Sequence, residues 1–93
     1  MNPTTTHTFD LFAPWRVSPQ VSIRDESFGA LAYNHDNRRL VFLKSRPLVG
    51  LVRQLAQFDN ASDALDALVP TDQRERYVAA LTSLATSEIL CGR

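Results

Sequence analysis

The sequence predicts an α+β fold in which a three-stranded antiparallel sheet comes first and three α-helices follow. Two patterns support this prediction. Residues 21–44 have the pattern of strands: Val21 and Ile23 alternate with polar residues at a period of two, and two short apolar segments then flank a turn-forming dipeptide. From Ser45 onward the apolar residues recur at helical spacing, and breaks at Asp59 and Pro70 divide this half of the chain into three segments.

Length and composition favour a single domain, which we place at residues 21–90. The chain has 93 residues, of which 44% are hydrophobic and 22% charged, close to the globular average. Ten basic and ten acidic residues give a net charge of zero, whereas proteins that bind nucleic acid through phosphates carry a basic excess. The single cysteine, Cys91, excludes an internal disulfide and a multi-cysteine zinc site. No apolar run approaches the length of a membrane span, and we expect a cytoplasmic protein.

Residues 1–20 are expected to form an irregular N-terminal arm. They contain three prolines, Pro3, Pro14 and Pro19, together with four threonines. Large apolar residues interrupt the arm, and they suit either packing over the core or binding of a partner: Phe9, Leu11, Phe12 and Trp15.

The strands begin at Val21 and Ile23, which alternate with polar residues, and a turn-like stretch at 25–29 follows. Residues 30–35 and 38–44 then flank Asp36-Asn37, a dipeptide that tolerates the positive φ of a tight hairpin turn. A two-residue loop there would place large residues opposite large ones on one face and small opposite medium ones on the other. The predicted pairs are Leu31 with Phe42, Tyr33 with Leu40, Ala30 with Leu43, and Ala32 with Val41.

The same loop predicts which backbone groups of the third strand face outward. With His35 and Arg38 as the first hydrogen-bonded pair, bonding alternates along the hairpin. The free backbone groups would then belong to Arg39, Val41 and Leu43, on an edge strand of a three-stranded meander.

Helix signals follow from Ser45, a candidate N-cap, and Pro47, which suits a first turn. The apolar stripe of the first helix is Leu48, Leu51, Val52, Leu55 and Ala56. Ser62 is a candidate N-cap for a short second helix, which Pro70 ends. The third helix is expected from Thr71 or Asp72 to about Leu90, with a core stripe of Val78, Leu81, Ala85 and Ile89. This order of elements is winged-helix-like, with the strands before the helices.

Enzymatic chemistry is not indicated. His7 lies in the arm, His35 flanks the hairpin turn, and Asp25-Glu26 would point to opposite faces of an extended segment. Cys91 has no basic cluster around it that would activate a thiolate. With three glycines in the chain, there is no glycine-rich phosphate loop. We therefore expect no catalytic residue, no metal site and no cofactor.

Three non-enzymatic functions remain: a peptide-binding module, a DNA-binding regulator and a non-catalytic scaffold subunit. A winged-helix DNA-binding regulator is the alternative that the element order suggests, but the opening of the last helix, 71–76, is charge-balanced and poorly equipped to read bases. The stretch from Arg38 to Arg46 contains four basic residues and no acidic one. It suits either an edge strand guarded by charges or a docking edge for an extended acidic peptide.

Three stretches resemble a known family: Pro14–Arg24 (PWRVSPQVSIR), Phe28–Tyr33 (FGALAY) and Arg38–Ser45 (RRLVFLKS). They are similar to the mycofactocin precursor-peptide chaperones (the MftB family), within the PqqD-like peptide recognition elements, and the similarity runs from about Trp15 to Leu90. The resemblance implies a non-enzymatic peptide chaperone. It would bind the leader of a ribosomally synthesised precursor peptide and present it to a radical S-adenosylmethionine (SAM) maturase.

In the wider group the leader adds as a strand beside the third strand and lies against the third helix. Carried onto this chain, the resemblance implies a binding edge with Arg39, Val41, Leu43 and Lys44. It implies a helix flank made by Arg74, Tyr77, Leu81 and Leu84. By helical geometry Tyr77 and Leu84 lie at the margin of the predicted core stripe, so packing in the core is the alternative for Tyr77. The sequence does not decide whether two copies form a homodimer by exchanging the hairpin.

Overall fold

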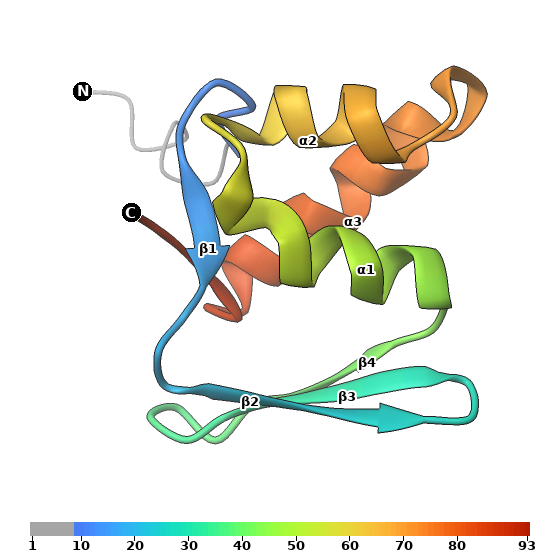
Figure 1. The fold of residues 1–93 in the computed structure, drawn as a ribbon. Coiled ribbons are helices and arrows are strands. Elements are labelled where there is room, and N and C mark those ends of the chain that lie inside the picture. Colours follow the sequence, from blue (N-terminus) through green and yellow to red (C-terminus); the bar gives the residue numbers. More distant parts are fainter. Residues whose placement is uncertain (1–8) are drawn as a thin grey trace.

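The computed structural model describes residues 9–93, so the expectations for Pro3 and His7 lie outside the described residues. Strands β2 (Val21–Glu26), β3 (Gly29–Asn34) and β4 (Leu40–Leu43) form an antiparallel sheet in the order β2-β3-β4. Helices α1 (Arg46–Gln54), α2 (Ala61–Leu68) and α3 (Arg74–Thr86) follow, and all lie on one side of this sheet (Figure 1). The predicted α+β class is confirmed.

The helix starts agree in part with the predicted caps. The Ser45 side chain accepts a hydrogen bond from the Leu48 N–H at 3.2 Å, as an N-cap does, and proline stands in the first turn of α1. The last residues of the predicted stripe form a 3₁₀ turn, η2 (Leu55–Gln57). The cap of α2 is Asn60, which accepts from the Asp63 N–H at 2.8 Å, whereas the predicted cap Ser62 is buried inside the helix.

The third helix is shorter than predicted. A 3₁₀ turn, η3 (Thr71–Gln73), precedes α3, and the chain leaves the helix through Glu88, whose φ of 65° is left-handed. The buried residues of α3 are Tyr77, Leu81 and Leu84. The predicted stripe is confirmed at Leu81 and Ile89, which are fully buried, whereas Val78 and Ala85 pack against the core only partly buried. Tyr77 and Leu84 belong to a second apolar stripe that shares Leu81, and spacing alone does not choose between the two.

A small second sheet joins the two ends of the described chain. Strand β1 (Trp15–Val17) pairs antiparallel with β5 (Leu90–Gly92), so the predicted irregular arm is wrong at 15–17 and the predicted helix is wrong at Leu90. Strands of three residues are too short to show a period of two.

Residues of the arm that precede β1 pack on the body of the domain. Phe9 is buried and stacks on Trp15 with 4.6 Å between ring centroids. The Trp15 indole N–H donates to the Asp10 carbonyl, and the Leu11 carbonyl accepts from the Ser62 N–H of α2, both at 2.8 Å. Within residues 9–93, no helix is long and apolar enough to cross a membrane.

The predicted hairpin register is confirmed for all four pairs. Ala30, Ala32 and Leu43 are fully buried on the face that meets the helices. The loop itself differs from the prediction: the backbone hydrogen bond from the Asn34 N–H to the Arg39 carbonyl closes a loop of four residues, 35–38, rather than two. Its left-handed residue is Arg38, with φ 65°, and neither residue of the Asp36-Asn37 dipeptide has a positive φ.

Candidate functional site

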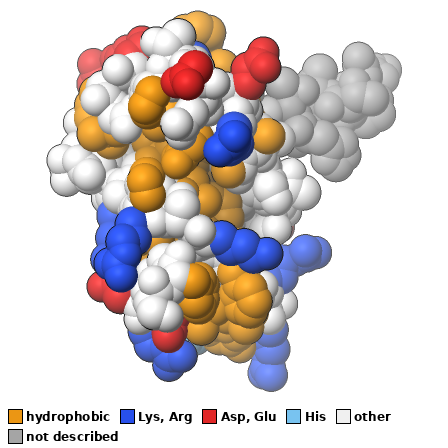
Figure 2. Space-filling model, turned by 90° about the vertical axis from the view of Figure 1, so that its right-hand side faces the viewer, with side chains coloured by type: hydrophobic (Ala, Val, Ile, Leu, Met, Phe, Trp, Pro, Cys, Tyr) orange, Lys and Arg blue, Asp and Glu red, His pale blue; other side chains and the backbone are white. Residues whose placement is uncertain are grey.

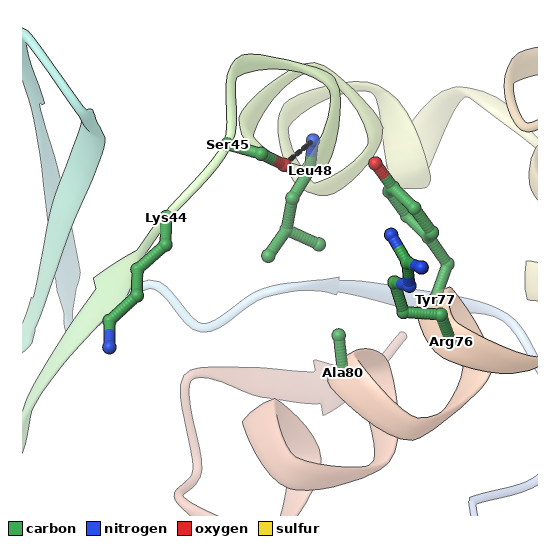
Figure 3. Close-up of a pocket in the computed structure, with 6 residues that line it drawn as sticks. All are labelled: Lys44, Ser45, Leu48, Arg76, Tyr77 and Ala80. Carbon is green, nitrogen blue, oxygen red and sulfur yellow. Dashed lines mark hydrogen bonds between the residues drawn. The ribbon is translucent and has the colours of Figure 1, made fainter. Parts of the chain in front are cut away.

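A groove of about 240 Å³ opens where β4 ends, between the start of α1 and the middle of α3 (Figure 3). Its lining residues are Lys44, Ser45, Leu48, Arg76, Tyr77 and Ala80. Leu48 of α1 points toward α3, from which Arg76 and Tyr77 project toward α1. The groove therefore has an apolar floor with basic groups at its rim.

Local sequence builds both walls of the groove. The Ser45 cap fixes the first turn of α1, and this turn holds Leu48 on the side that faces α3. On α3, Arg76 and Ala80 are four residues apart and so lie on one line along the helix surface, beside the buried stripe that begins at Tyr77. Tyr77 belongs both to the core and to the groove wall, because its side chain is almost fully buried and still lines the groove.

The two cations of the groove carry unneutralised charge. Lys44 and Arg76 are exposed, and within the part of the chain that the structure describes neither forms a salt bridge. An apolar floor beside free cations suits an extended peptide that carries both apolar and acidic side chains.

The outer edge of β4 borders this groove, and its hydrogen bonds show which backbone groups are free. The Asn34 N–H donates to the Arg39 carbonyl at 2.9 Å, and the His35 N–H donates in the opposite direction, to the carbonyl of Gln20, just before β2, at 2.8 Å. Since bonding alternates along a strand, Ala32 and Ala30 bond to Val41 and Leu43.

A glycine contact supports the same assignment. The Leu43 carbonyl oxygen lies so close to Gly29 that a β-carbon there would stand 2.0 Å from it, so this carbonyl faces β3. The prediction that Arg39, Val41 and Leu43 direct their backbone groups outward was therefore wrong. The free N–H and C=O groups on the β4 edge belong to Leu40 and Phe42.

Comparison with known proteins identifies the family. The model of the peptide chaperone MftB family matches residues 14–91. The chain belongs to this family. It is 44% identical over 84 residues to the peptide chaperone MftB of Mycolicibacterium smegmatis, an alignment that covers 89% of this chain and 82% of that protein. The peptide chaperone MftB of Mycobacterium tuberculosis is 41% identical over 86 residues, covering 91% of this chain and 79% of that protein. No solved structure matches the chain significantly.

Membership of the MftB family confirms the resemblance expected from the sequence and supports a role as a peptide chaperone in mycofactocin biosynthesis. The relatives are named chaperones, not enzymes. Among the described residues, no group of three or more histidine, cysteine or acidic side chains is placed to hold a metal ion.

The structure brings only some of the expected site residues together. Lys44 and Tyr77 line one groove. Arg39 lies at the hairpin end of the edge, where its backbone N–H donates to the Asn37 side-chain oxygen at 2.9 Å. Val41 is partly buried and Leu43 fully buried on the inner face of β4.

The other expected residues of α3 lie away from the groove surface. Arg74 pairs with Asp66 and donates to the Ser62 hydroxyl at 2.8 Å, which ties α3 to α2. Leu81 and Leu84 are buried in the core. The groove residues that were not predicted as site residues are Ser45, Leu48, Arg76 and Ala80. Arg76 lies one turn before Ala80, so the sequence places these two residues on one face of a helix, but it does not show that this face lines a groove.

Proposed function

We propose that this MftB-family protein binds the leader of a ribosomally synthesised precursor peptide as an added strand on β4 and presents it to a radical SAM maturase. It acts in the cytoplasm, in mycofactocin biosynthesis, and catalyses no reaction itself. The observation that carries the proposal is the position of the edge: the free backbone groups of Leu40 and Phe42 lie beside an apolar groove whose basic side chains, Lys44 and Arg76, form no salt bridge within residues 9–93.

The opposite edge of the sheet is the weaker template. Strand β2 ends in Asp25 and Glu26, and each of these carboxylates already pairs with an arginine, Arg53 and Arg24. Because these two arginines are already paired with carboxylates, they attract an acidic leader less than unpaired basic side chains would. The β4 side instead presents Arg39, Lys44 and the groove.

The short edge accounts for only part of the binding. Two residues with outward N–H and C=O groups can form few backbone hydrogen bonds, each with a net value of about 0.5–1.5 kcal/mol. We therefore assign the groove a substantial share, through apolar side chains of the leader that cover Leu48, Tyr77 and Ala80. Lys44 and Arg76 hold acidic groups at the rim.

The test fills the groove while the edge stays intact. Ala80→Tyr places a ring in the groove, and Ala79→Tyr, on the exposed neighbouring position of α3, is the matched control. Calorimetric titration with a synthetic leader of the precursor peptide should show binding to wild type and to Ala79→Tyr, and at least tenfold weaker binding to Ala80→Tyr. Equal affinities of the two variants would remove the groove from the site, and no binding to wild type would contradict the function.

The maturase part of the proposal has its own test. A radical SAM enzyme encoded beside this protein should modify the full precursor peptide faster when the protein is present, as followed by mass spectrometry. The Ala80→Tyr variant should not give this acceleration. Equal rates with and without the wild-type protein would contradict the presentation role.

A further inference from the structure

The outer face of the sheet, turned away from the helices, carries an apolar surface that the groove does not explain. We call this surface the outer patch; its residues are Phe28, Leu31, Tyr33, Leu40 and Phe42. Three of them are large and strongly exposed: Phe28 at 43%, Leu40 at 56% and Phe42 at 54%. The rings of Phe28 and Phe42 lie against each other, with 5.7 Å between centroids. A contiguous exposed apolar surface of this kind usually marks a binding site.

The outer patch covers the outer face of β4, and the groove begins at Lys44, directly after this strand, on the side of the sheet that carries the helices. Figure 2 shows two hydrophobic areas on this side of the molecule, with basic side chains between and around them. The outer face is also hollowed by a depression of about 360 Å³, which Leu31, Tyr33 and Leu40 help to line. The edge of β4 runs between the depression and the groove.

A strand bound to this edge would touch both surfaces. Successive side chains of a strand point to opposite faces, and each lies about 4.5–5.5 Å from the residue opposite it. A leader residue opposite Leu40 or Phe42 therefore lies on the outer patch. Its neighbours, opposite Val41 or Leu43, point to the inner face, the side of the sheet on which the helices and the groove lie.

We infer that the outer patch is the second half of the peptide site, and that it selects a leader segment whose consecutive residues are apolar. An alternating segment would cover one face only and leave the other exposed. This inference rests on the proposed strand addition and adds to it the sequence pattern of the ligand. The occupant follows from continuity: Leu40 and Phe42 supply both the free backbone groups of the edge and two side chains of the patch.

Two synthetic probes of about ten residues test the pattern. Both have glutamates at their ends; the centre of one is all valine, and the centre of the other alternates valine with threonine. Valine and threonine have nearly the same shape and are both β-branched, so the probes differ in apolar surface on one face. Affinities are measured by fluorescence anisotropy for wild type, for the double variant Phe28→Ser/Phe42→Ser, and for Phe12→Ser.

Wild type should bind the all-valine probe about tenfold more tightly than the alternating probe, since several half-exposed apolar side chains become covered. The double variant should reduce this ratio to about two, because the outer face then offers little apolar surface. Phe12 is 75% exposed on the arm, outside both surfaces, so Phe12→Ser should keep the wild-type ratio. Circular dichroism of each variant confirms that it is folded.

An unchanged ratio in the folded double variant would overturn the inference. So would a change of oligomeric state without a change of ratio, because the patch would then belong to a contact between two copies. Either result leaves the Ala80→Tyr comparison with the leader unaffected, so failure of the outer patch is distinguishable from failure of the proposed function.

Discussion

Proline substitutions along β4 give the sharpest test of the hydrogen-bonding assignment. Proline has no N–H and is tolerated on an edge strand only where that N–H would face away from the sheet. The N–H of Phe42 faces outward, so Phe42→Pro should leave the hairpin paired and remove one donor from the peptide edge. Phe42→Ala is the matched control, because it loses the same ring without losing the N–H.

Val41→Pro should instead destabilise the fold. The N–H of Val41 faces β3, and its loss leaves the fully buried Ala32 without a partner for its carbonyl. An unsatisfied buried group costs about 1–3 kcal/mol, and loss of the partly buried valine side chain adds about 1 kcal/mol. For a domain of this size each kcal/mol lowers the melting temperature by roughly 4–8 °C. We therefore expect Val41→Pro to lower the melting temperature by about 10–25 °C.

Thermal unfolding followed by circular dichroism and titration with the synthetic leader provide the two measurements. Phe42→Pro and Phe42→Ala should melt within about 5 °C of each other, since both keep the β3–β4 ladder. Phe42→Pro should bind the leader about tenfold more weakly than Phe42→Ala, because a bound peptide carbonyl loses its donor. The opposite result, an unfolded Phe42→Pro beside a folded Val41→Pro, would restore the two-residue loop and refute the assignment.

Three further predictions concern charge, the hairpin loop and nucleic acid. The double variant Arg39→Ala/Lys44→Ala should weaken leader binding, by at most about fivefold for each exposed cation, and titration in rising salt should shrink the difference. Asn34→Ala should cost about 2–4 kcal/mol of unfolding free energy in urea titration, because the buried Asn34 side chain bonds both the Asp36 N–H and the Glu88 carbonyl; equal stability of the variant would contradict this. Duplex DNA should show no submicromolar, salt-sensitive complex by gel shift at physiological ionic strength, and finding one would favour a DNA-binding regulator.

Side-chain pattern was enough to predict the hairpin register but not its hydrogen bonds. A two-residue loop at 36–37 and a four-residue loop at 35–38 have the same centre, so both pair Leu31 with Phe42. The two loops differ by one residue in the position of the first hydrogen-bonded pair. This difference reverses which residues of β4 direct their N–H and C=O groups toward β3 and which direct them outward. The Asn34 side chain favours the four-residue loop, because its oxygen accepts hydrogen bonds from the loop N–H groups of Asp36 and Asn37.

That decision depends on tertiary contacts. The Asn34 carboxamide oxygen accepts from the loop N–H of Asp36, while its amide nitrogen donates at 2.8 Å to the carbonyl of Glu88, which follows α3. The hairpin loop is therefore shaped by a contact between residues 54 positions apart. No local turn preference of Asp36-Asn37 contains that information.

The groove was predictable only in part, for a related reason. Lys44 and Tyr77 were expected from the family resemblance, but Arg76 became visible only once α3 was placed, because the orientation of the helix depends on which of two overlapping stripes is buried. Arg74 illustrates the converse case. Its sequence position suited the site, yet its contacts with Asp66 and Ser62 hold it against α2.

The basic residues around β4 reconcile the two readings that the sequence left open. An exposed edge strand with apolar side chains invites pairing with other chains, and charged residues on such an edge oppose it. Arg39 and Lys44 bracket Leu40–Leu43, so two copies approaching edge to edge would bring like charges together. An acidic peptide approaching the same edge meets attraction instead. The guarding and docking roles thus belong to the same residues, and in the proposed function the sign of the charge on the incoming strand decides which role they play.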